Sequence, residues 1–76
     1  MSNQQIDEAI LRVVAVRQQK VAMIISKAAD LLPSHFREGD EGYELIASRI
    51  EALVHEGQLV AYGNLQRWRY SEVKRA

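Results

Sequence analysis

The residues of this chain that could carry out catalysis or bind a metal are few and poorly spaced for either role. The sequence has no cysteine, which excludes disulfides, thiolate metal sites and thiol nucleophiles. His35 and His55 lack the His-x-x-x-His spacing of a metal site, and no acid is placed to orient either histidine beside a serine. Gly39 and Gly42 lie in an acidic segment that would repel phosphate. We therefore predict no enzymatic activity, no cofactor and no metal, with both histidines on the surface.

Charge provides the first constraint on binding. Ten Lys and Arg residues balance ten Asp and Glu residues, whereas nucleic-acid-binding proteins usually have a basic excess. The two signs are separated along the chain. Residues 38–56 contain six acids and one arginine, a net charge of −5, and residues 64–76 contain four bases and one acid, a net charge of +3. This separation predicts one acidic and one basic surface.

Composition and hydropathy indicate a single globular domain over residues 1–76. Hydrophobic residues make up 47% of the chain and charged residues 26%, which is the balance of an ordinary folded protein. The apolar stretches are short and interrupted by charges, so we expect neither a membrane span nor a signal peptide. Together with the absence of cysteine, this favours a cytoplasmic protein. A chain of this length buries a modest core, so burial against a partner would add to its stability.

Two apolar stripes at helical spacing dominate the first half of the chain. A helix is predicted to begin near Asn3, where Ser2 and Gln5 have the spacing of a capping box. A second helix is predicted within residues 21–32, ahead of a proline. The segment between the two helices contains neither glycine nor proline, and the apolar positions also fit a coiled-coil repeat. Local rules therefore leave open whether residues 3–32 form one helix or two.

A third helix is predicted after a loop over residues 33–42, which we expect Phe36 to pin to the core. Asp40 or a neighbour should cap this helix, and Gly57 should end it in the left-handed conformation. Its predicted buried stripe consists of Tyr43, Ile46, Ile50, Leu53 and Val54. Its predicted exposed stripe consists of Glu44, Ser48, Glu51 and His55.

Two β-prone runs follow Gly57. Residues 59–62 and 67–73 are predicted to form antiparallel strands that turn about residues 63–64. Alternation within the second strand would place Trp68 and Tyr70 on one face. The opposite face would carry Arg67, Arg69, Ser71 and Val73. Because a two-stranded hairpin is marginal alone, one of its faces should lie on the helices.

The order of these elements resembles a winged helix-turn-helix domain. Residues 17–20 fall where such domains place a short first strand, which favours two helices rather than one. Residues 49–65 followed by 71–73, with residues 20–25 opening the second helix, are similar to a bacterial family of unknown function that has a winged-helix-like fold. The similarity covers about two thirds of the chain. It implies an α+β fold of three helices and a two-stranded antiparallel hairpin, with a short third strand near 17–20, and it implies no activity.

The charge of the predicted third helix bears on what the domain could bind. In winged helices the third helix usually enters the major groove, but here its exposed carboxylates would face phosphate. We therefore expect a small non-enzymatic binding or regulatory module that contacts a protein partner, or a second copy in a homodimer. The candidate protein-contact residues are Glu44, Ser48, Glu51 and His55. Strand edges at 67–73 or in the first segment could also pair across a two-fold axis.

Nucleic-acid binding through the predicted hairpin is the alternative function. Basic charges for phosphate alternate there with aromatic rings that could stack on bases. The candidate residues are Arg67, Trp68, Arg69, Lys74 and Arg75. Simple alternation favours a different arrangement, in which Trp68 and Tyr70 cover the core and the arginines face solvent. A protein partner or a second copy is thus preferred over nucleic acid, and the sequence does not identify the partner.

Overall fold

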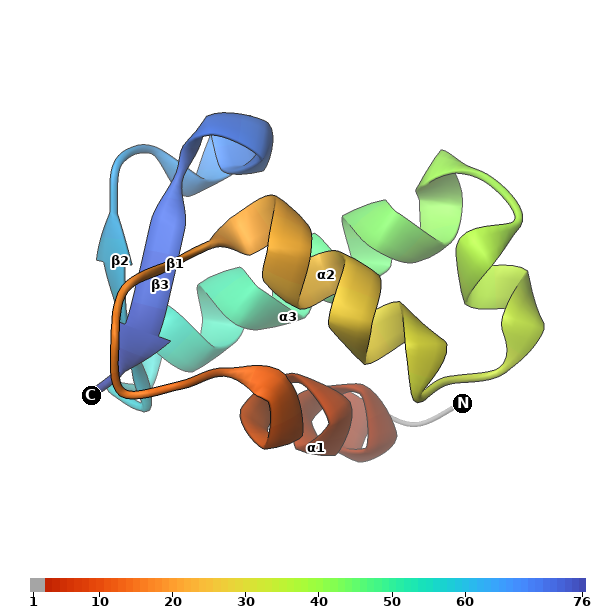
Figure 1. Cartoon of the computed structure of the whole chain (residues 1–76), viewed down its shortest axis with the longest axis horizontal. Coiled ribbons are helices and arrows are strands. Elements are labelled where there is room, and N and C mark those ends of the chain that lie inside the picture. The colour runs from red at the N-terminus through yellow and green to blue at the C-terminus, as the bar shows by residue number, and fades with distance from the viewer. Residues whose placement is uncertain (1–2) are drawn as a thin grey trace.

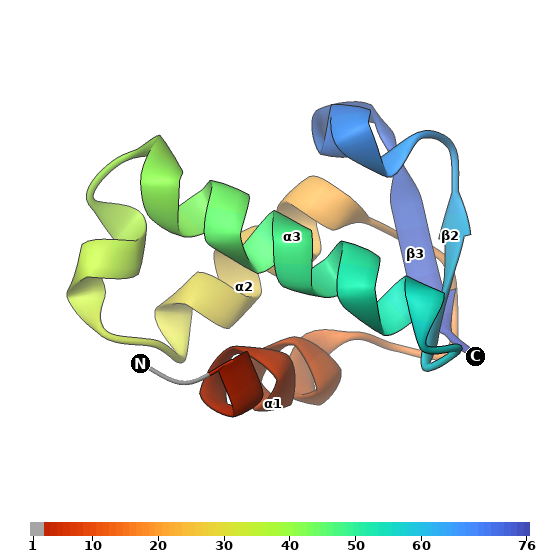
Figure 2. The ribbon, with the colours of Figure 1, turned by 180° about the vertical axis from the view of Figure 1, so that it is seen from behind.

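The three helical patterns of the sequence form three α-helices in the computed structural model, which describes residues 3–76. Helix α1 spans Asn3–Val13, α2 spans Val21–Asp30 and α3 spans Asp40–His55. All three helices contact one another, and a small sheet stands at one end of the helical layer (Figures 1 and 2). The predicted cap at Ser2 lies outside the described residues. The apolar stripes meet in one core, so the α+β class predicted from the sequence is confirmed.

Residues 3–32 form two helices, separated by strand β1 at Gln19–Lys20. This strand lies within the predicted segment 17–20. The side-chain Oε1 of Gln19 accepts a hydrogen bond from the backbone N–H of Ala15 at 3.0 Å. The N–H of Val21 donates to the carbonyl of Ser71 at 3.0 Å. These bonds to distant or non-helical partners satisfy backbone groups that a continuous helix would have paired internally.

The sheet is antiparallel, with strand order β1-β3-β2. Strand β2 spans Leu59–Tyr62, as predicted, and β3 spans Glu72–Arg75. In the register, Val73 of β3 lies opposite Gln19 of β1 on one side and Ala61 of β2 on the other. The predicted strand over 67–73 is therefore wrong in its bounds. Because β3 is central, it has no free edge for pairing across a two-fold axis.

Residues Leu65–Tyr70 form a 3₁₀ segment, η2, in place of the first part of the predicted strand. Asn64 begins it, because its Oδ1 accepts a hydrogen bond from the N–H of Gln66 at 2.9 Å. A kink at Arg67, with φ −114° and ψ 57°, separates two turns. Trp68 then points inward and is 7% exposed, whereas Tyr70 is 84% exposed.

The face assignments made for the second strand are consequently wrong. Trp68 and Tyr70 do not share a face, since only Trp68 covers the core. The four residues assigned to the opposite face also divide, with Arg67 and Arg69 exposed and Ser71 and Val73 buried. The physical reason is the kinked 3₁₀ segment, which does not have the two-residue period of a strand.

The third helix agrees closely with its prediction. Its buried stripe includes three fully enclosed residues and two half-buried ones: Ile46, Ile50 and Leu53, then Tyr43 and Val54. Gly57, at φ +84°, ends the helix, and its N–H donates to Val54 O while that of Gln58 donates to Leu53 O. Gly39, rather than Asp40, is the residue before the first helical turn. The predicted exposed stripe lies on the other side of α3 from the buried stripe and faces solvent.

A short 3₁₀ segment, η1 at Ser34–Arg37, packs against α3. Phe36 is 2% exposed and pins this segment to the core, as predicted. Gly42 lies against it so closely that a Cβ at position 42 would be 2.6 Å from the Cα of Phe36. Contacts between backbones therefore set the angle at which α3 begins.

Candidate interaction surfaces

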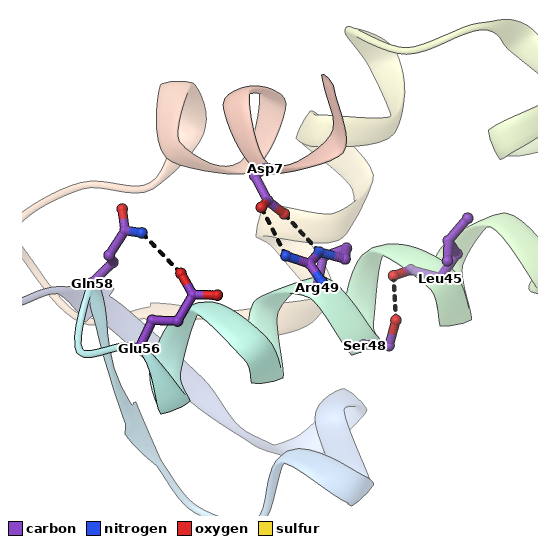
Figure 3. Close-up of polar contacts among 6 residues, drawn as sticks. All are labelled: Asp7, Leu45, Ser48, Arg49, Glu56 and Gln58. Carbon is purple, nitrogen blue, oxygen red and sulfur yellow. Dashed lines mark hydrogen bonds and ion pairs between the residues drawn. The ribbon is translucent and has the colours of Figure 1, made fainter. Parts of the chain in front are cut away.

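The exposed face of α3 carries the four residues predicted to contact a protein. Glu44, Ser48, Glu51 and His55 are all exposed. The Ser48 hydroxyl donates to Leu45 O at 2.8 Å within the helix (Figure 3). Within residues 3–76, the side chains of Glu51 and His55 have no hydrogen-bond or ion-pair partner. The middle and the end of this face are therefore free to meet another molecule.

Arg49 is the single base among the acids of residues 38–56, and Asp7 of α1 neutralises it. Its Nε and Nη2 donate to the two carboxylate oxygens of Asp7 at 2.8 and 2.9 Å (Figure 3). This hydrogen bonding to Asp7 raises the pKa of the Arg49 guanidinium. The bidentate pair ties α1 to α3. It also leaves the exposed face of α3 without a free basic side chain.

Glu44, at the start of the same face, has a structural partner. The indole Nε1–H of Trp68 lies 3.3 Å from each of its carboxylate oxygens. The Arg69 guanidinium lies 3.7 Å from the same carboxylate and stacks on the Trp68 ring, 4.2 Å from its centroid. Residues predicted for two different surfaces thus form one cluster that fastens η2 to α3. In this position Trp68 has no exposed ring face on which a base could stack.

Arg75 also bonds within the protein. Its Nε donates to Val14 O at 3.0 Å, its Nη2 donates to Leu11 O, and its backbone N–H donates to Ala15 O at 2.9 Å. These are carbonyls at the end of α1 and just beyond it, which have no partner in the helix itself. Arg75 therefore joins the last strand to the first helix.

The remaining candidate nucleic-acid residues, Arg67 and Lys74, lie on different elements. Arg67 is exposed on η2, where it lines a shallow hollow with Asn64 and Tyr70. Lys74 is half-buried on β3, opposite Val60 of β2. Neither side chain has a hydrogen-bond or ion-pair partner within residues 3–76. The structure therefore divides the five predicted residues into two free bases and three that hold the fold together.

Metal-binding clusters and membrane-spanning helices are not found in the part of the chain that the structure describes. Over residues 3–76 there is no cluster of three or more His, Cys, Asp or Glu side chains arranged to hold a metal ion. Within the same residues, no helix has the length and apolar character needed to cross a membrane. The candidate sites are therefore surfaces: the acidic face of α3, the η2 hollow and the sheet.

No family model matches the chain, and no solved structure matches it. It is similar to the "Uncharacterized protein YjeN" of Escherichia coli (strain K12), with 40% identity over 76 residues that cover 93% of this chain and 71% of that protein. The chain therefore belongs to the same bacterial family, whose function is unknown.

Proposed function

We propose that this protein is a winged helix-turn-helix module that acts in the cytoplasm, without enzymatic activity, by binding a protein partner through the exposed face of α3. The order of elements supports the fold assignment: α2 and α3 would be the helix-turn-helix, and β2, η2 and β3 would be the wing. The strand order β1-β3-β2 is consistent with it.

The observation that carries the proposed function is the internal pairing of bases near α3. Arg49 is bonded to Asp7 and Arg69 lies against Glu44, so neither is free to bind phosphate. The Glu51 side chain, by contrast, is exposed and has no hydrogen-bond or ion-pair partner within residues 3–76. A helix with this charge in the recognition position would repel a duplex and attract a basic protein surface.

Photo-crosslinking in cells tests this proposal. A benzophenone amino acid at Ser48, in the middle of the exposed face, should give a discrete protein adduct. The same amino acid at Ser26, an exposed serine of α2, is the matched control and should not. Glu51→Lys should reduce the Ser48 adduct several-fold without altering the fold. An adduct that is equal at both positions, or unchanged by Glu51→Lys, would refute the proposal.

Nucleic-acid binding is the second candidate function, and the η2 hollow favours it. Arg67 and Tyr70 are exposed side by side there, with an unpaired guanidinium and an unpaired phenol within residues 3–76. Titration of labelled duplex and single-stranded nucleic acid at low and moderate salt would test this function. Micromolar binding with a steep salt dependence, lost in Arg67→Glu, would establish it and displace the first proposal. Absence of binding at low salt would eliminate it.

A further inference from the structure

We propose that a second copy of this chain pairs with the free edge of β2 about a two-fold axis, which would join the two sheets into one of six antiparallel strands. The proposal goes beyond the function proposed above, because it adds a second protein contact. It uses a surface separate from the exposed face of α3, so either proposal can fail alone. Strand β2 is an outer strand of the sheet and lies at the margin of the molecule in both views (Figures 1 and 2).

The hydrogen-bond pattern shows which backbone groups of β2 face outward. The N–H of Ala76 donates to Gln58 O at 3.2 Å, so Gln58 faces β3. Because residues of an antiparallel strand alternate in direction, Val60 and Tyr62 also bond to β3, and Ala61 directs its N–H and C=O away from the sheet. Strand β3 shows the same alternation, since the N–H of Arg75 bonds on its opposite side, to Ala15 O. Leu59 faces outward by the same alternation, so Leu59 and Ala61 are the hydrogen-bonding residues of the free edge within β2.

This edge lacks the features that usually prevent strands from pairing between molecules. Residues Leu59–Tyr62 include no charge and no proline, and their register with β3 is unbroken. The other outer strand, β1, has only two residues, one of which is Lys20. Val60 and Tyr62 are 37% and 38% exposed on the solvent face of β2. The β2 edge is therefore the better of the two for pairing.

The residues of β2 are complementary to themselves in an antiparallel arrangement. With the axis at Ala61, this residue would exchange two hydrogen bonds with Ala61 of the partner subunit. Val60 would then lie opposite Tyr62 of the partner subunit, and the symmetry would repeat that pair. Such non-hydrogen-bonded positions bring side chains closest, and aromatic rings pack well on β-branched residues there.

Charge favours the same arrangement. The C-terminal end of α3 precedes β2, and Glu56, the residue that follows α3, is exposed there (Figure 3). The segment after β2 carries Arg67, whose side chain is exposed and has no hydrogen-bond or ion-pair partner within residues 3–76. An antiparallel pair places the start of one strand beside the end of the other, so Glu56 would lie near Arg67 of the partner subunit on both sides of the axis. Opposite charges at both ends select a second copy as the occupant.

Hydrogen exchange measured at several protein concentrations tests this pairing without any substitution. The amide of Ala61 should be poorly protected at low micromolar concentration and increasingly protected toward millimolar concentration. The amide of Val60, which bonds to β3 within one molecule, should be protected throughout. Sedimentation should show a dimer over the same range. A monomer at millimolar concentration, or exchange at Ala61 that does not depend on concentration, would overturn the proposal.

Variants give an independent test. Ala61→Pro removes an N–H that has no partner in the monomer, and should weaken association roughly tenfold or more while leaving the fold intact. If that variant does not fold, the charge pair decides: Arg67→Glu and Glu56→Arg should each weaken the dimer, and the two together should restore it. Failure of the double variant to restore a dimer would contradict the axis. Glu51→Lys should leave the dimer unchanged, which separates this proposal from the function proposed for α3.

Discussion

Ile50 lies in the middle of α3 with no exposed surface, and replacing it with alanine should destabilise the protein by about 2–5 kcal/mol. The loss combines the transfer of the removed methyl and methylene groups with the cavity that they leave among α1, α2 and α3. A chain of this size is expected to have a free energy of unfolding of roughly 4–11 kcal/mol. The substitution would therefore remove a large part of the stability and lower Tm by roughly 10 °C or more.

Urea unfolding followed by Trp68 fluorescence is a suitable assay, because Trp68 is the single tryptophan and is buried in the folded state. Low micromolar protein keeps any self-association from adding to the measured stability. Two matched variants calibrate the result. Ile50→Val should cost about 0.5–1.5 kcal/mol. Glu51→Ala, on the adjacent exposed position, should change stability by less than about 0.5 kcal/mol.

The outcome that refutes the reasoning is equally specific. A loss near zero for Ile50→Ala would mean that α3 presents a different face to the core. A loss at Glu51 as large as that at Ile50 would mean the same. Either result would also remove the basis for treating Glu44, Ser48, Glu51 and His55 as one exposed surface.

Three further substitutions test contacts that hold the elements together. Gly42→Ala should lower Tm, even though alanine favours a helix by about 1 kcal/mol, because the new Cβ would collide with the backbone of Phe36; a raised Tm would contradict the close approach. Trp68→Phe should cost about 1 kcal/mol by circular dichroism through loss of the indole bond to Glu44, and the same change made after Glu44→Ala should cost less. Arg75→Met should cost about 1–2 kcal/mol and speed amide exchange near the end of α1; exchange limited to β3 would show that the contact is unimportant.

The helices could be predicted from the sequence because their signals are local. The apolar stripe of α3 lies at a spacing that only a helix brings to one face, and Gly57 follows its last turn. The same kind of pattern could not decide between one helix and two in the first half of the chain. The break depends on Gln19 and Val21, whose backbones lie beside β3, more than fifty residues away. No window of local sequence contains that partner.

The error at Arg67–Tyr70 has a similar origin. Alternating basic and aromatic residues have the two-residue period of a strand, and tryptophan and tyrosine are common in strands. What the protein forms instead depends on Asn64, whose side chain starts a turn, and on the bonding of Trp68 to Glu44 of α3. Asn64 was a usable local signal, because asparagine commonly bonds to the backbone two residues onward. The contact with Glu44 was not visible in the sequence.

For the candidate surfaces, the sequence could predict which side chains of α3 are exposed, but not which charged side chains bond to another part of the protein. The acidic character of α3 follows from its composition, and all four residues predicted from helical spacing to be exposed are exposed. Asp7 and Arg49, which neutralise each other, lie on different helices, and no sequence motif indicates this contact. Arginine is usually a surface residue, but the Arg75 side chain donates to a carbonyl just beyond the end of α1 and acts as a helix cap. A count of charges therefore overstated the basic surface of the protein.

The central position of β3 also affects how the protein can be made. Both neighbours of β3, β1 and β2, precede it in the chain, and each reaches the other only through it. During synthesis, the helices can therefore pack as they leave the ribosome, while both outer strands stay unpaired until Glu72–Arg75 emerge. Because Arg75 also caps α1, the first helix is completed only at that moment. A shortened chain that stops after Tyr62 would contain the residues of every α-helix but lack β3, and with it the sheet, the buried Trp68 and Val73, and the Arg75 bonds that finish the first helix.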